Sequence, residues 1–533
     1  LEYMKIEKIL SVVRLWSLAC LLSCSGTLSA CSGGDDGVID EGDKGLPAGN
    51  VTVKVIGDKK TVLRNPLNGW VMYMGRGWDE NFWTTMGYDN MKVPELATPV
   101  KVSDYASTCY IRTSWSSLNP SEGVYVWNDP NARLTKLFKS ALDRNMRLSF
   151  RIVVDGRDQG LNTPQYVFDA GAASYPDPNG NNGESRKSPY PDDEIFQQKY
   201  AAFIEAFAKE FDDPDKVDFI DAYGLGKWGE AHTMLYKDYA NKEKVFEWIT
   251  SLYSRCFKKV PLVINYHRLV GANNTSGWGA VASDTEKLLN SAINKGYSLR
   301  HDAFGMTGYY QDWEKQFAER WNYKRPIIME GGWITGGTHR YWIDPSGKYR
   351  EGHPEDVRQG EFDASAEAHV NMMDFRVGDE TNSWFTKCFS LVQRFVTEGG
   401  YRLYPDMISL PKDVTSGQKV SIVHRWNNMG WGYCPTNIPQ WNQKYKVAFA
   451  LLDNNDKVVK VFVDEQTDLS TWLKGKPTTY NFDLTMKGVS VGVYNWAIGL
   501  VDTTKDNEIG LQMAVTKNLT DSGWVRLLQV TVK

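Results

Sequence analysis

The chain has 533 residues, of which 42% are hydrophobic and 24% charged, and its formal net charge at pH 7 is -4. A chain of this length exceeds one ordinary compact core, so we expect a globular protein of two domains plus a leader. The sequence contains no basic block, which excludes nucleic acid as an expected partner. Aromatic residues make up 13% of the chain, with 20 Trp and 27 Tyr. Aromatic faces stack on sugar rings, so this surplus suits a carbohydrate site, although most of these residues are expected in the core.

The amino-terminal residues have the pattern of an export signal. Basic residues follow Met4, then comes the apolar run LWSLACLL, and LSAC ends at Cys31. The run is too short to span a bilayer as a permanent helix. LSAC resembles the bacterial lipobox, which implies a lipoprotein signal peptide at 1–30 and lipidation of Cys31; LLSC, ending at Cys24, is a poorer match. Residues 31–50 are expected to be a flexible tether and resemble the export tag of Bacteroidetes surface lipoproteins. We therefore expect an outer membrane lipoprotein that faces the cell surface or the periplasm.

Four cysteines remain outside this leader, and no two of them form a CxxC pair. They are Cys109, Cys256, Cys388 and Cys434. Their wide spacing favours buried free thiols over a zinc site or a disulfide framework. The histidines also lack the spacing of an HExxH motif. We therefore expect no metal and no cofactor.

Short β-like runs alternate with helical patterns from residue 51 to residue 400. The helical patterns are clearest at 193–211 and 241–259. Strands that alternate with helices predict a parallel sheet, and eight such strands predict a closed (β/α)8 TIM barrel. The eight predicted strands are GWVMYM (69–74), STCYIRTSW (107–115), RLSFRIVVD (147–155), DFIDAYGLG (218–226), PLVINYH (261–267), AFGMTG (303–308), PIIMEGG (326–332) and AHVNMMDF (368–375).

After residue 400 the pattern changes to short alternating runs separated by Asn, Asp, Gly and Lys turns. Examples are KVSIVHRWNN, KYKVAFALLD and YNWAIGLVD. Because no helix-length pattern separates these runs, we expect an antiparallel β-sandwich domain at 401–533. The predicted fold class is therefore α/β, with a TIM barrel followed by this sandwich.

Two glutamates stand where catalytic residues of such a barrel are found. Glu230 lies in GLGKWGEAH (224–232), after the fourth predicted strand, and Glu330 lies in PIIMEGGW (326–333), at the end of the seventh. Active sites of TIM barrels form at the carboxyl ends of the strands, so these side chains can converge on one cleft. Hydrolysis of a glycosidic bond needs such a pair of carboxyl groups, about 5–5.5 Å apart when configuration is retained. Alternatively, each is a loop carboxylate paired with an arginine.

The same segments resemble the clan A glycoside hydrolases, retaining enzymes whose catalytic acids end strands four and seven. A closer resemblance is to an uncharacterised bacterial family of putative glycosidases that join such a barrel to a sandwich, carried here by NPLNG (65–69) and GLGKWGE (224–230). If the pair is catalytic, we expect Glu230 to be the general acid/base, with a pKa raised by enclosure near Trp228 and by the charge of its partner. We expect Glu330 to be the nucleophile, kept ionised by nearby donors. In place of the Asn that precedes the acid/base in most clan A enzymes, this chain has Gly229.

Further residues near the predicted strand ends are candidates for substrate binding. In clan A enzymes an Arg and a Tyr often donate to the nucleophile, which implies such a role for Arg112 and for Tyr309 or Tyr310; a structural ion pair explains Arg112 equally well. Histidines at these positions are more often structural than ligand-binding. The candidate substrate-binding residues are Arg112, Trp78, Asp155, Trp228, His232, His267, Tyr309, Tyr310, Trp333 and His369.

These observations favour a retaining glycoside hydrolase that acts on an oligosaccharide or polysaccharide at the bacterial cell surface. The alternative is a non-catalytic, lipid-anchored carbohydrate-binding protein on a barrel scaffold, which explains the aromatic residues and Cys31 equally well. A carbohydrate lyase or esterase is a third possibility, but the sequence has no GxSxG elbow.

Overall fold

The computed structural model describes most of the chain after the predicted leader. The described residues are 45–74, 77–155, 160–176, 187–270, 272, 279–306, 308–335 and 347–533. Leu1–Leu46 and Pro47–Lys533 are separate units, and the second contains every element described below. The predicted signal peptide, Cys31 and most of the predicted tether lie outside the described residues. Across the described ranges, no helix combines the length and apolar character that crossing a membrane requires.

Eight parallel strands close into a barrel, and each pairs with the next one in chain order. The closed barrel confirms the predicted (β/α)8 fold. Its strands are β2 (Gly69–Met74), β3 (Ala106–Ser114), β4 (Arg147–Val153), β7 (Val217–Asp221), β8 (Leu262–Asn265), β9 (Tyr297–Asp302), β10 (Ile327–Glu330) and β11 (Met372–Asp374).

One barrel strand differs from its prediction. The sixth strand is β9, YSLRHD, and not the AFGMTG segment at 303–308 that follows it. Two of the three inward residues of β9, Arg300 and Asp302, are charged, whereas apolar content alone favours the later segment. The prediction of the sixth strand is therefore wrong by one segment.

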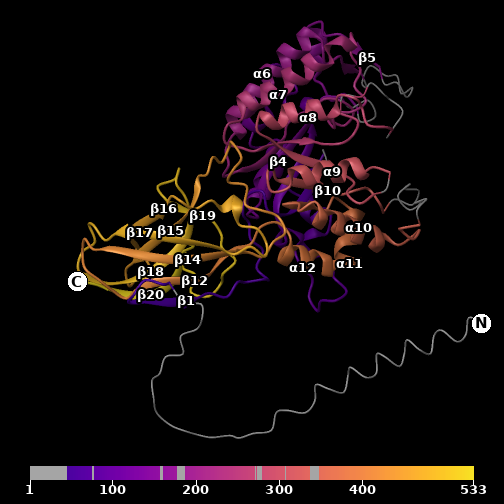
Figure 1. Ribbon diagram of the computed structural model, residues 1–533. Helices are drawn as coiled ribbons and strands as arrows, with labels where there is room; N and C mark the ends of the chain where they lie inside the picture. Colours follow the sequence, from indigo (N-terminus) through magenta and orange to yellow (C-terminus); the bar gives the residue numbers. More distant parts are fainter. Residues whose placement is uncertain are drawn as a thin grey trace, which may run out of the picture. The chain divides into compact units, whose positions relative to one another are not determined.

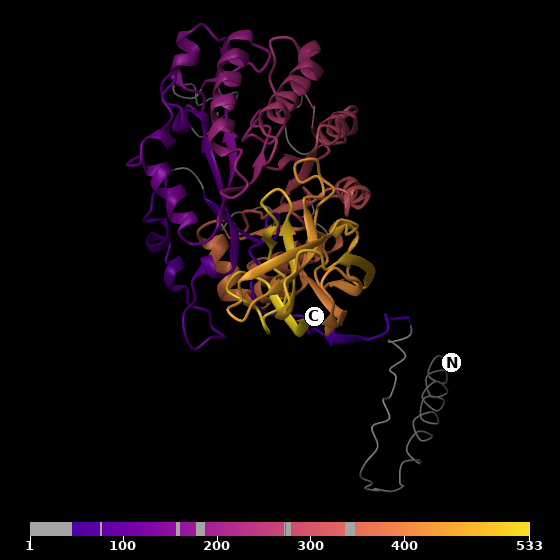
Figure 2. The ribbon, with the colours of Figure 1, turned by 90° about the vertical axis from the view of Figure 1, so that its left-hand side faces the viewer.

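Helices surround the barrel strands (Figures 1 and 2). The predicted helical patterns at 193–211 and 241–259 correspond to α6 and α7. Asp193 caps α6 by accepting a hydrogen bond from the Phe196 amide at 3.0 Å. The helices are α2 (Phe82–Thr85), α3 (Trp115–Leu118), α4 (Arg133–Leu142), α5 (Gln165–Asp169), α6 (Glu194–Phe211), α7 (Lys242–Cys256), α8 (Thr285–Asn294), α9 (Asp312–Trp321), α10 (Pro354–Glu367), α11 (Asp379–Lys387) and α12 (Phe389–Glu398).

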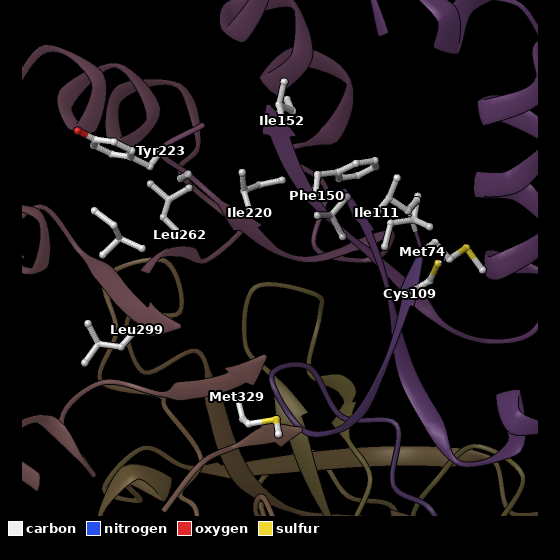
Figure 3. Close-up of a cluster of buried hydrophobic side chains, with 14 of the residues drawn as sticks. Met74, Cys109, Ile111, Phe150, Ile152, Ile220, Tyr223, Leu262, Leu299 and Met329 are labelled. Atoms are coloured by element: carbon white, nitrogen blue, oxygen red, sulfur yellow. Dashed lines mark hydrogen bonds between the residues drawn. The ribbon is translucent and has the colours of Figure 1, made fainter. Parts of the chain in front are cut away.

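Alternation along the barrel strands separates an apolar outer face from an interior that holds charged side chains beside apolar ones. Phe150, Ile152 and Leu299 belong to the apolar cluster between strands and helices (Figure 3). Because side chains alternate across a strand, their neighbours Arg151 and Arg300 point into the barrel, where both are fully buried. The barrel interior therefore contains charged side chains at strand positions where the sequence alone predicts buried apolar residues.

The carboxyl-terminal residues form two sheets that share one apolar core, which includes Ile422, Phe449 and Ile498. Nearly all pairings are antiparallel; the exception is the two-residue β13, which runs parallel to β20. The predicted sandwich is confirmed. One sheet has the order β1 (Asn50–Lys54), β12 (Leu403–Pro411), β14 (Lys419–Asn428) and β17 (Thr478–Thr485); the other has β13 (Asp413–Val414), β20 (Val525–Val532), β18 (Gly492–Asp502), β15 (Tyr445–Leu452) and β16 (Val458–Asp464), with β19 (Glu508–Leu511) paired to β18. A two-stranded ribbon of β5 (Ser174–Tyr175) and β6 (Ser188–Pro189) lies in the insertion after β4.

Strand β1 corrects the predicted domain boundary at residue 50. It pairs antiparallel with β12, from Asn50 opposite Pro411 to Lys54 opposite Met407. The chain therefore contributes a strand to the sandwich before it enters the barrel, and residues 51–54 belong to the sandwich. Local patterning could not reveal this, because the partner strand lies more than three hundred residues later.

The NPLNG motif joins the start of the barrel to the sandwich. Asn65 exchanges two hydrogen bonds with the backbone of Gln512, at 2.9 and 2.7 Å. Asn68 accepts one from the Tyr401 amide at 2.7 Å, and Gly400 packs so closely against Asn68 that a side chain there would collide with it. The motif that carries the family resemblance thus has a structural role at this junction.

Candidate active site

Glu230 and Glu330 lie at the carboxyl-terminal mouth of the barrel, as their sequence positions predict. Glu330 is the last residue of β10, the seventh barrel strand. Glu230 lies in the loop that follows β7, the fourth strand. Both side chains are buried. Residues 177–186, between β5 and β6, and residues 336–346, after β10, lie outside the described ranges.

The loop that carries Glu230 is held in an unusual backbone conformation. Gly224, Gly226, Trp228, Gly229 and Ala231 all have positive φ, between 60° and 77°. A Cβ at Gly224 would lie 2.5 Å from a backbone carbonyl of β4. These glycines therefore serve the tight coil and its packing. Positive φ at Trp228 and Ala231 is strained, and such strain is concentrated at functional sites.

A single guanidinium connects the two glutamates. Arg151, on β4, donates from Nη1 to Glu230 Oε1 at 2.8 Å and from Nη2 to Glu330 Oε2 at 2.6 Å. Two bonds to one planar fork keep these two oxygens within roughly 8 Å of each other. The expected convergence of the strand-four and strand-seven acids therefore exists in this structure.

Glu330 is enclosed by three arginines. Besides Arg151, Arg300 Nε donates to its Oε2 at 3.1 Å and Arg376 Nη1 to its Oε1 at 2.6 Å. Burial alone would raise the pKa of Glu330, but the three guanidiniums together hold that pKa well below its usual range. The side chain is therefore ionised, as a nucleophile or an electrostatic stabiliser must be. It also has no exposed surface.

The protonation state expected for Glu230 is wrong. Burial and the charge of Glu330 do raise its pKa, as enclosure was expected to do. A hydrogen bond from His232 Nε2, at 3.3 Å from Glu230 Oε2, and the Arg151 guanidinium outweigh them and lower the pKa to about 2. Glu230 is thus ionised at neutral pH, whereas a general acid must hold a proton.

Gly229, where most clan A enzymes carry Asn, packs against Arg151. A Cβ placed on Gly229 would lie in van der Waals contact with Arg151 Cδ, at 3.4 Å. The φ of Gly229 is 77°, a left-handed conformation that glycine adopts without strain. The glycine therefore serves the backbone of this loop.

Two further carboxylates, Asp221 and Asp374, accept hydrogen bonds from the same arginines. Asp221 accepts from Arg151 Nε at 2.7 Å and from the Tyr110 hydroxyl at 3.0 Å. Asp374 accepts from Arg300 Nη2 at 3.2 Å. Burial raises the pKa of each of these aspartates, and the arginines oppose that rise. Buried ions persist only when each is paired, so this network is mutually dependent.

The donors expected for Glu330 are replaced by Arg300 and Arg376. The Tyr310 hydroxyl lies 3.3 Å from that of Tyr266, in the core, and Tyr309 packs in a small apolar cluster with Met306 and Ile334. Arg112 donates only weakly, to the Tyr73 hydroxyl at 3.5 Å.

His267 and Asp155 are structural in this conformation. His267 Nε2 donates to the Glu230 backbone carbonyl at 2.7 Å, and burial lowers the pKa of His267 to about 3. Asp155 accepts from Tyr175 and Ser188, each at 2.8 Å, and so ties β5 and β6 to the end of β4. His267 therefore helps to position the loop that carries Glu230. The side chains of His267 and Asp155 are both buried, contrary to the sugar contacts expected for them.

The three tryptophans lie near the mouth, with different exposure. Trp333, directly after the Glu330 strand, is 39% exposed, and the Arg376 guanidinium lies 5.0 Å from its ring centroid. Trp228 is partly buried below the Lys227 ammonium, which lies 4.3 Å from its ring centroid. Trp78 packs edge-on against Phe82. Trp333 therefore presents the largest free aromatic face of the three.

The prediction for His369 is wrong. The eighth strand begins at Met372, so His369 precedes it, at the amino end of the barrel. His369 Nδ1 lies 3.0 Å from the hydroxyl of Tyr323, which precedes β10. The predicted strand, 368–375, also has His369 at its amino end, so the placement of His369 beside the mouth did not follow from the predicted bounds.

No group of three His, Cys, Asp or Glu side chains within the described residues is arranged to hold a metal ion. Cys109, Cys388 and Cys434 are buried free thiols, as predicted, and Cys256 is a half-buried one.

Comparison with known proteins gives matches in shape only. No family model matches the chain, and no curated protein matches it by sequence. Among solved structures, the catalytic domain of β-amylase from Paenibacillus polymyxa is 10% identical, with 62% of this chain and 99% of that chain covered and a TM-score of 0.41. A glycoside hydrolase family 30 subfamily 8 xylanase from Clostridium acetobutylicum is 11% identical, covering 81% and 96%, with a TM-score of 0.36. Xylanase 10B from Thermotoga petrophila, in complex with xylobiose, is 13% identical, covering 62% and 94%, with a TM-score of 0.37.

Proposed function

We propose that this protein is a glycoside hydrolase that cleaves O-glycosidic bonds of an oligosaccharide or polysaccharide at the mouth of its barrel. The observation that carries the proposal is the bridge from Glu230 through Arg151 to Glu330. It gathers carboxyl groups from strands four and seven at the mouth of the barrel, where Glu330 can act together with a second carboxyl group as glycosidases require.

The state of Glu330 suits the charge that this reaction develops. Cleavage passes through an oxocarbenium-like centre, which an ionised carboxylate stabilises or attacks directly. We propose that Glu330 is the nucleophile and that configuration is retained. Both of its oxygens accept hydrogen bonds from arginines, so attack on the sugar carbon requires the substrate to displace one of these donors.

Two features at the mouth support sugar binding. Trp333 offers an exposed ring on which the apolar face of a sugar can stack. Arg112 has two buried donors, Nε and Nη2, with no acceptor among the residues that the structure describes. Leaving such donors unpaired costs free energy, so a hydroxyl or ring oxygen of the substrate is a suitable acceptor.

The full burial of Glu330 favours one alternative, a non-catalytic carbohydrate-binding protein that retains the barrel. The two functions differ in turnover. A binding protein retains glycans without cleaving them, whereas the proposed enzyme releases reducing ends or a free aryl alcohol.

The proposed site of action is the bacterial surface, through a lipid anchor at Cys31 in the outer membrane. This part rests on the LSAC motif alone. The anchor would keep the barrel close to glycans outside the cell, and the sandwich is proposed to support the barrel or to bind carbohydrate.

A screen of purified protein against 4-nitrophenyl glycosides and natural glycans tests the proposal. We expect turnover of at least one substrate class, with the anomeric configuration of the first product retained when it is followed by proton NMR. Binding without turnover would favour the carbohydrate-binding alternative, and an inverted first product would refute the nucleophilic role of Glu330.

A further inference from the structure

A third carboxyl group extends the bridge between the two glutamates. Asp302 ends β9, and its Cα is paired with that of Glu330 across the two neighbouring strands. Arg376 donates from Nη2 to Asp302 Oδ1 at 2.8 Å and from Nη1 to Glu330 Oε1 at 2.6 Å. Glu230, Glu330 and Asp302 therefore form a row joined by two guanidiniums. We refer to these three residues as the carboxyl row.

Glu330 is the centre of the carboxyl row, and its two neighbours are held in the same way. Arg151 spans Glu330 and Glu230, and Arg376 spans Glu330 and Asp302. Each pair therefore stands within a similar distance, roughly 8 Å or less between the bonded oxygens. By distance alone, either Glu230 or Asp302 could therefore act with Glu330 in a reaction that needs two carboxyl groups.

The free oxygens distinguish these two partners. Both oxygens of Glu230 are engaged, one by Arg151 and the other by His232. Asp302 uses only Oδ1, and its second oxygen has no hydrogen-bond partner among the residues that the structure describes. The Asp302 side chain is also 20% exposed, compared with 7% for Glu230 and none for Glu330. A substrate oxygen can therefore reach Asp302 without displacing a protein donor.

We propose that Asp302, rather than Glu230, donates the proton that the departing glycosidic oxygen receives. The proposal rests on the glycosidase function proposed above and names a catalytic residue for it. Sequence reasoning missed Asp302 because the sixth strand was expected one segment later.

The charges that face Asp302 keep a proton on it at neutral pH. Burial raises its pKa most, and the carboxylates of Glu330 and Glu230 raise it further, whereas the guanidiniums of Arg376 and Arg151 lower it. The outcome is a pKa of about 8. Two further charged residues of this network are Arg300, on the same strand as Asp302, and Asp374, on β11. They form a hydrogen bond with each other. At neutral pH Asp302 is thus protonated while its two neighbours in the row are ionised, which is the division of roles that a glycosidase needs.

The proposed reaction balances with one water molecule. In the first step Glu330 forms a bond to the sugar carbon, the carbon–oxygen bond breaks with its electron pair on the oxygen, and that oxygen takes the proton of Asp302. In the second step the oxygen of water bonds to the same carbon, the bond to Glu330 breaks, and the proton of water returns to Asp302. Glu230 remains ionised throughout and holds Arg151 in place.

Leaving-group dependence tests the proposal. Asp302→Asn keeps the oxygen that accepts from Arg376 but cannot donate a carboxylic proton; Glu230→Gln is the matched change at the other end of the row. For alkyl glycosides, whose leaving oxygen needs a proton, we expect Asp302→Asn to lower kcat/KM by about 100-fold or more. For 4-nitrophenyl glycosides of the same sugar, which leave without a proton, we expect a loss of less than about 10-fold. Asp302→Glu should recover part of the alkyl activity.

The pH profile gives a second readout. Wild-type kcat/KM on alkyl glycosides should fall as pH rises through about 8, because Asp302 loses its proton there. Glu230→Gln should keep a descending limb and Asp302→Asn should lose it. The assignment would be overturned if the wild type is active and Glu230→Gln, rather than Asp302→Asn, loses much more activity on alkyl glycosides than on 4-nitrophenyl glycosides.

Infrared difference spectroscopy separates this assignment from the proposed function, because it needs no substrate. We expect the wild-type protein at pH 6 to show a protonated-carboxyl band that Asp302→Asn lacks, with matching circular dichroism as the control for folding. Absence of that band from the wild type overturns the assignment alone. A wild-type protein that shows the band but hydrolyses no glycoside refutes the proposed function, and with it any catalytic role of Asp302.

Discussion

Replacing Arg151 with methionine should destabilise the protein strongly, because this fully buried guanidinium bonds three carboxylates. Methionine has a similar length and no charge. After the change Glu330 still has Arg300 and Arg376. Asp221 still has the Arg300 guanidinium at 3.6 Å and the Tyr110 hydroxyl. Among the described residues, Glu230 retains His232 alone as a hydrogen-bond partner. One buried charge is therefore left without its cation, and breaking a buried pair in this way costs about 3–5 kcal/mol.

Urea unfolding of the two proteins measures this loss as a shift of the midpoint at unchanged slope. Arg255→Met is the matched control, since Arg255 contacts Glu205 at 3.0 Å with both side chains more than half exposed. An exposed pair of this kind contributes about 0–1 kcal/mol. The difference between the two variants isolates the effect of burial.

A double variant identifies the charge that causes the loss. In Arg151→Met/Glu230→Gln the uncompensated carboxylate is removed, so the double variant should regain stability relative to Arg151→Met by about 1–3 kcal/mol. A loss in Arg151→Met no larger than that in Arg255→Met would refute the reasoning. So would a double variant less stable than Arg151→Met.

Three further predictions concern pH, the exposed tryptophan and the membrane. Folding raises the pKa of Asp302 from 3.8 to about 8, so between these pH values the folded protein holds a proton that the unfolded chain has lost. The free energy of unfolding of the wild type, compared with that of Asp302→Asn, should therefore fall between about pH 4 and pH 8, by at most about 1.4 kcal/mol per pH unit. Equal pH dependence of the two proteins in urea unfolding would contradict this. Trp333→Ala should raise KM about 10-fold or more with a smaller change in kcat, because the ring binds ground state and transition state alike; an unchanged KM on the best substrate would exclude the stacking role. Cys31→Ser should release the protein from membranes or leave it unprocessed, and membrane association equal to wild type in cell fractionation would rule out the lipid anchor.

The sequence predicted the barrel and the positions of Glu230 and Glu330 because both depend on local patterns. The apolar run IIME ends in Glu330 at the predicted strand end, and GWVMYM coincides with β2. Strand β1 was missed because its partner is β12, and pairing over that separation leaves no local trace.

The charged interior was missed for a different physical reason. The strands were predicted from the apolar residues of their outer face, whereas Arg151 and Arg300 lie on the face that points into the barrel. A signal was available in RLSFRIVVD, since an arginine inside an apolar strand is costly unless an acid pairs with it. Which acids pair with it depends on the closure of the barrel, which brings β4, β7 and β10 together. The lowered pKa of Glu230 follows from that closure and could not be read from its neighbours in sequence.

The central claim is that Glu330 acts on the sugar carbon at the mouth of the barrel, beside the other carboxyl groups of the row. Its most direct test is the turnover of Glu330→Gln beside wild type, on the best substrate found by the glycoside screen, with melting temperatures as the control for folding. We predict that wild type hydrolyses the substrate and that the folded Glu330→Gln variant loses activity by at least about 1,000-fold while it still binds the glycan. Full activity in a folded Glu330→Gln variant would contradict the claim.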